Sequence, residues 1–155
     1  MLLSVVRDWA RIRERRRLRK RVARTLALES RGGILDDRLA LTKLSNYLEV
    51  EWCARDVHPW NQDLPAERKG ELFVAQALKD TLTAIHRLFD DLTEVDTIHL
   101  RVLEPAPPHQ ALLAGTVSRR DLLTARRLPS PAMGLKMLGI QYEVHDGSFE
   151  RLTLP

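Results

Sequence analysis

The sequence has one cysteine, Cys53, so an intrachain disulfide and a zinc site built from several thiolates are both excluded. Aromatic residues make up only 5% of the chain, so the core must consist mainly of Leu, Val, Ile and Ala. No run of about 18 apolar residues occurs, so no segment is expected to span a bilayer. These absences predict a protein of a reducing compartment, cytoplasmic or peripheral to a membrane.

Recognisable catalytic spacing is also lacking. Gly115, Gly134 and Gly139 do not have the spacing of a phosphate-binding loop. The histidines form no His-x-x-x-His pair, and a Cys-x-x-Cys pair is impossible with one cysteine. The sequence therefore names no reaction, and no cofactor and no small-molecule substrate are expected.

Charge is the most unusual property that the sequence does have. Residues 1–24 contain ten Lys or Arg and only two acids, a net charge of +8. Because the whole chain carries +4, the remainder must carry −4. The residues that give the chain its high isoelectric point therefore lie in the N-terminal segment, and the body that follows is mildly acidic.

Residues 2–28 are predicted to be helical, since they lack Gly and Pro and are rich in Arg, Leu and Ala. Two apolar stripes, which begin at Val5 and at Leu18, do not join smoothly across the arginine run, which argues against a continuous coiled coil. Gly32 and Gly33 are expected to end the helix. The predicted division is a basic helical arm, residues 1–31, and an α+β domain, residues 34–155.

The body, with 44% apolar residues in the chain as a whole, can build a core. Asp36 or Asp37 is expected to begin a short helix that ends at Leu44. The strongest signal is a long amphipathic helix over residues 65–93, with Asp63 as its N-cap. Alternation of apolar and polar residues predicts strands at 48–54, 97–104, 111–118, 140–144 and 148–152.

Two shorter elements complete the predicted body. Ser118 followed by Asp121 has the pattern of a helix N-cap, and a short helix to about Leu128 is expected. Residues 132–138 fit either a helix or a strand. The order β-α-β-β-α-β predicts an α+β fold: the basic helix followed by a ferredoxin-like sandwich with one main mixed or antiparallel sheet. That fold hosts many functions and selects none.

The arm is the first candidate binding element. An arginine-rich helix suits an acidic protein surface, nucleic acid or anionic lipid, and it can equally be a solvated extension. Because arm and body carry opposite charge, contact with a protein, including another copy, ranks first. The predicted partner-binding residues are Arg11, Arg13, Arg15, Arg16, Arg17, Arg19, Lys20, Arg21 and Arg24, with Trp9 and Trp60 as apolar anchors.

A metal or catalytic site is the rival hypothesis. Asp56 and His58 lie two apart in an extended segment, and His99 or His145 would have to supply a further ligand. Cys53 has no base beside it in the sequence. The leading expectation is a non-enzymatic binding or assembly module that forms homo-oligomers or binds a protein partner through the arm and a sheet edge. An enzyme that uses Asp56 and His58, or a membrane-associated domain bound to lipid or nucleic acid, is the alternative.

Overall fold

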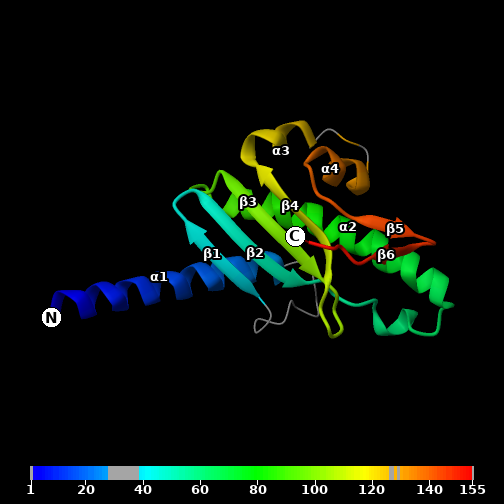
Figure 1. Cartoon of the computed structure of the whole chain (residues 1–155), viewed down its shortest axis with the longest axis horizontal. Coiled ribbons are helices and arrows are strands. Elements are labelled where there is room, and N and C mark those ends of the chain that lie inside the picture. Colours follow the sequence, from blue (N-terminus) through cyan, green and yellow to red (C-terminus); the bar gives the residue numbers. More distant parts are fainter. Residues whose placement is uncertain (1, 28–38, 126–127, 129, 155) are drawn as a thin grey trace.

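The computed structural model describes residues 2–27, 39–125, 128 and 130–154, which form an α+β fold (Figure 1). The elements are α1 (Leu2–Ala27), β1 (Ala40–Leu44), β2 (Tyr47–Cys53), the 3-10 turn η2 (Pro59–Asn61), α2 (Ala66–Asp91), β3 (Thr97–Leu103), β4 (Ala111–Ser118), α3 (Arg119–Ala125), α4 (Pro131–Met137), β5 (Glu143–His145) and β6 (Ser148–Glu150).

Strands β1 to β4 form one mixed sheet in the order in which they occur along the chain. The pairs β1–β2 and β3–β4 are antiparallel, whereas β2 and β3 are parallel and joined through α2. A parallel connection requires a crossover, and the long helix provides it. The predicted antiparallel hairpin of β3 and β4 is confirmed.

The ferredoxin-like arrangement is not confirmed. In that split β-α-β pattern another strand separates the two parallel strands. Here they are direct neighbours, with Val50 opposite Leu100. The last strand, β6, pairs with β5 in a separate two-stranded sheet. The α+β class and the mixed main sheet are as expected.

One face of the main sheet forms the core. Alternate residues of β2 and β3 are buried against α2, whose Ile85, Leu88 and Phe89 have no exposed surface. Figure 1 shows α2 and part of α1 behind the sheet. The polar residues of the same strands face the other way, and on β2 this is the predicted division: Leu48, Val50 and Trp52 inward. The second face of the sheet therefore carries polar side chains over β2 and β3, whereas the first half of β4, Ala111–Ala114, is buried on both faces.

The helix predicted to end at Leu44 is wrong over its described part, because residues 40–44 form the edge strand β1. A tight connection at Ser45, with φ of 55°, turns the chain directly into β2. Leu41 lies opposite Val50 and is only half-buried. An edge strand with one covered face gives weak alternation, so spaced leucines resembled a helical stripe.

Helix α2 occupies nearly the predicted range, but its cap differs. Its N-cap is Pro65, which makes no side-chain capping bond, so the prediction of Asp63 is wrong. The undecided residues 132–138 belong mainly to α4, which Ser130 caps by accepting a hydrogen bond from the Met133 amide at 3.2 Å. The predicted cap of α3 is present, with the Asp121 amide 3.2 Å from the Ser118 hydroxyl.

The β5–β6 hairpin packs on α2 through an aromatic cluster. Asp146 and Gly147 both have positive φ, as the predicted tight turn requires. The ring of Phe149 meets those of Phe73 and Tyr142 edge-on, at 5.9 and 6.3 Å between centroids. Burial raises the pKa of Tyr142 above its ordinary value. These contacts give the hairpin a structural role.

Candidate functional site

The second half of α1 is docked on the body. Val22 is fully buried and Leu26 is 7% exposed, and both belong to the main core. The Thr25 hydroxyl donates to a carboxylate oxygen of Asp91 at 2.5 Å, and Arg21 donates to the Asp91 carbonyl at 2.7 Å. Apolar burial and these bonds at the end of α2 hold α1 in a fixed position.

The first half of α1 projects from the body (Figure 1). Every side chain of residues 5–17 is exposed. Six of these side chains are arginines, and Lys20 adds a further exposed cation. Within the described part of the chain they make no hydrogen bond and no ion pair. The exposed basic residues are Arg7, Arg11, Arg13, Arg15, Arg16, Arg17 and Lys20.

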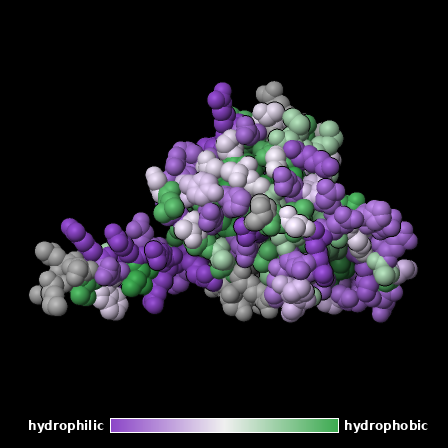
Figure 2. Space-filling model, viewed as in Figure 1, coloured by the Kyte–Doolittle hydropathy of each residue, from purple (hydrophilic) through white to green (hydrophobic). Residues whose placement is uncertain are grey.

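Large apolar side chains share this projecting half. Val5, Val6, Trp9 and Ile12 are 51%, 63%, 62% and 44% exposed. Figure 2 shows hydrophobic and hydrophilic side chains side by side on the projecting helix. The body covers none of these four residues, so the Trp9 ring is accessible to a partner.

The docked and free halves divide the predicted partner-binding cations. Arg19 donates to the Leu39 carbonyl at 2.7 Å, and Arg21 forms an ion pair with Glu94 at 3.4 Å in addition to its bond to Asp91. These two arginines attach the helix to its own body. Arg24 lies in the docked half but is exposed, like the cations of the free half.

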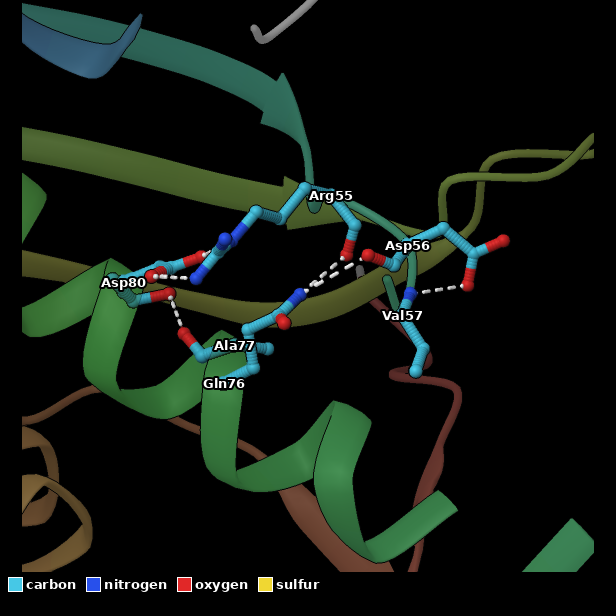
Figure 3. A network of polar contacts seen from close by, with 7 residues as sticks. Arg55, Asp56, Val57, Gln76, Ala77 and Asp80 are labelled. Atoms are coloured by element: carbon cyan, nitrogen blue, oxygen red, sulfur yellow. Dashed lines mark hydrogen bonds and ion pairs between the residues drawn. The ribbon is translucent and has the colours of Figure 1, made fainter. Parts of the chain in front are cut away.

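Asp56 and His58 have local partners, and Figure 3 shows those of Asp56. A carboxylate oxygen of Asp56 accepts from the Val57 amide at 2.7 Å, and its carbonyl accepts from Gln76 of α2 at 3.3 Å. The Nδ1 atom of His58 accepts from the Trp60 amide at 3.2 Å, which caps η2. These bonds give both residues the role of organising the loop between β2 and α2.

The other candidate ligands lie elsewhere. His99, on the open face of the sheet, contacts the Thr116 hydroxyl at 2.8 Å, and His145 pairs with Asp146 at the hairpin turn. Among the described residues no group of three or more His, Cys, Asp or Glu is placed to hold a metal ion. The arrangement on which the metal hypothesis depends is therefore not found in the described residues.

Cys53 has an imidazole beside it that sequence reasoning missed. Its sulfur lies 3.8 Å from Nδ1 of His109, which is 56 residues away along the chain. The same Nδ1 lies 2.9 Å from the Glu104 carbonyl oxygen, which can only accept. A hydrogen bond to this carbonyl requires the proton on Nδ1, and in that tautomer Nδ1 does not act as a base for the thiol.

Two further surfaces are exposed. Trp60 is 88% exposed in η2, where its ring meets that of His58 edge-on. The open face of the sheet has a shallow groove between charged side chains. The groove is lined by Ala40, Leu41, Thr42, Glu49, Val50, Glu51, His99 and Arg101.

Comparison with protein-family models, curated proteins and solved structures gives no significant match. None of the helices in the described ranges is long and apolar enough to cross a bilayer. The projecting half of α1 is the largest group of exposed side chains of one charge described above, so function is inferred from that half.

Proposed function

We propose that the protein is a non-enzymatic binding and assembly module whose arginine-rich helix contacts an acidic surface or another polyanion. One observation carries the proposal: the exposed cations of α1 project from the body, outnumber the two acids of that half, Asp8 and Glu14, and form no ion pair with a described residue. These cations lie within one Debye length of each other, so their mutual repulsion raises the free energy of the unbound protein. An anionic partner would lower that free energy.

Two features of the body support a binding role over catalysis. The polar loop residues Asp56 and His58 are used in local hydrogen bonds, and Nδ1 of His109, the nitrogen beside Cys53, also lies within hydrogen-bond distance of the Glu104 carbonyl. The docked half of α1 supplies a rigid attachment, through Val22 and the Asp91 bonds. A rigidly held helix loses little conformational entropy when it binds.

The proposal is tested with the full-length chain and charge-matched variants. One variant carries Arg13→Gln, Arg16→Gln and Lys20→Gln. The control carries Lys69→Gln, Lys79→Gln and Arg120→Gln, which remove the same charge from the body. Binding to poly-L-glutamate and to duplex DNA is measured at low salt. We expect roughly a tenfold loss or more for the α1 variant and little change for the control.

Equal weakening by both variants would mean that net charge alone drives binding, and the proposal would be abandoned. Absence of binding by the unmodified chain to every anionic probe would also contradict it. Circular dichroism and urea unfolding of each variant establish that the substitutions leave the fold intact.

A further inference from the structure

The arrangement of side chains around α1 identifies one kind of partner. At 3.6 residues per turn, each residue advances about 100° around the helix axis. Six exposed residues then fall within one arc of about 100°, which we call the outer strip. The outer strip consists of Val5, Trp9, Ile12, Arg13, Arg16 and Lys20.

The outer strip faces away from the body. Its centre lies roughly 130° around the axis from that of Leu18, Val22 and Leu26, the residues through which α1 docks. A partner on that side can therefore contact the outer strip without meeting the sheet or α2. Of the four remaining exposed cations of the free half, Arg7, Arg11 and Arg15 lie on the docking side of the same helix, and Arg17 lies about 40° beyond the edge of the strip.

The outer strip changes character along the axis. Val5, Trp9 and Ile12 make its first part apolar over about 10 Å, and Arg13, Arg16 and Lys20 make the next 10 Å or so basic. An anionic bilayer presents the same order to a helix that enters it at a tilt with its N-terminal end deeper, since an apolar interior lies beneath a layer of phosphates. Interfacial helices bury their apolar face about 5–10 Å deep, and Trp residues gather at the headgroup level.

We propose, on the basis of the function proposed above, that the partner of α1 is an anionic lipid surface. The apolar part of the outer strip enters the boundary between headgroups and acyl chains, and its three cations contact lipid phosphates. Duplex nucleic acid supplies phosphates but no apolar layer beside them, so it would leave Val5, Trp9 and Ile12 in water. An acidic protein is the remaining alternative, which the test below separates.

Vesicle sedimentation tests the proposal directly. The full chain is mixed with vesicles of phosphatidylcholine alone or of phosphatidylcholine with phosphatidylglycerol. We expect binding to the anionic vesicles to be about tenfold stronger or more, because each basic residue near the surface adds to the attraction. High salt should weaken it, since screening shortens the range of that attraction.

Matched variants test the orientation. Arg13→Gln, Arg16→Gln and Lys20→Gln remove three charges from the outer strip, whereas Arg7→Gln, Arg11→Gln and Arg15→Gln remove three from the docking side. All six residues are exposed, so both variants should fold. We expect the first triple to weaken vesicle binding several-fold more than the second. Equal losses would overturn the proposed orientation.

Tryptophan fluorescence measures whether the outer strip inserts into the bilayer. Adding anionic vesicles should shift the emission of the unmodified chain to shorter wavelength, and acyl chains that carry bromine should quench it. Both effects should be absent in Trp9→Phe, because Trp52 is buried and Trp60 lies in η2, outside α1. Effects that persist in Trp9→Phe would contradict insertion of the outer strip.

The outcomes separate the two proposals. Binding to poly-L-glutamate or DNA without binding to anionic vesicles would overturn the lipid inference and leave the proposed function standing. Binding to none of these probes would overturn both.

Discussion

The side chain of Arg119 donates hydrogen bonds to three backbone carbonyl groups of the body. Its guanidinium donates to the carbonyl oxygens of Phe89 at 2.8 Å, Leu92 at 2.8 Å and Val95 at 2.6 Å. It also lies 5.0 Å from the centroid of the Phe89 ring. These carbonyls belong to the last turn of α2 and the segment after it, so one side chain satisfies acceptors that the end of a helix leaves open.

We expect Arg119→Lys to lower the free energy of unfolding by about 2 kcal/mol, because one ammonium group cannot match a planar fork that reaches three carbonyls. The adjacent Arg120 is exposed and makes no such bonds, so Arg120→Lys should change stability by less than about 0.5 kcal/mol. Urea unfolding of both variants measures the difference. A similar stability for the two would show that the carbonyl bonds contribute little.

At the scale of elements, α1 is one continuous helix with two environments. The sequence contains the signal for this division, since the apolar stripe that begins at Val5 does not align with the stripe that begins at Leu18. The first stripe is exposed and the second is docked. The offset was visible in the sequence, but which stripe would find a partner depended on the surface that the folded body offers.

A matched pair of substitutions tests the division. Val22→Ala removes a fully buried side chain and should lower stability by about 2 kcal/mol through lost burial and a residual cavity. Val6→Ala is the same change at a position that is 63% exposed, and it should alter stability by less than about 0.5 kcal/mol. If both changes cost the same, the docked and free halves do not differ as described.

Strong periodicity made most elements of the body predictable. Helix α2 and strands β2 and β3 each bury one regular face, and the positions of their apolar residues reveal it. Strand β1 was missed because it is short and lies at an edge. The pairing of β2 with β3 was missed because strand order depends on contacts between distant residues, which a local pattern does not contain.

The features of the candidate site also differ in how far the sequence could predict them. Arg13, Arg16 and Trp9 are exposed on the helix that their local composition predicts, so these candidates needed no knowledge of distant contacts. The contact of Cys53 with His109 required the register of the sheet and the loop after β3. The internal role of Arg21 likewise depended on the position of Asp91, at the far end of another helix.

At the scale of the whole molecule, the body should be stable without the projecting half. Residues 5–17 are exposed, and the described contacts of α1 with the core begin at Leu18. Removing residues 1–17 should leave the urea midpoint and the m-value nearly unchanged, because little tertiary surface is lost from the folded state. A clear fall in either quantity would show that the projecting half is held by the body.

The continuity of α1 has a mechanical consequence. The helix contains no Gly or Pro over residues 2–27, so it has no built-in hinge between the docked and the free half. It therefore behaves as a rigid rod about 20 Å long over the free half. A partner that binds the outer end of this rod also fixes the tilt of the sheet and the distance of the sheet from the partner's surface. The open sheet face would then be presented at a constant height and angle.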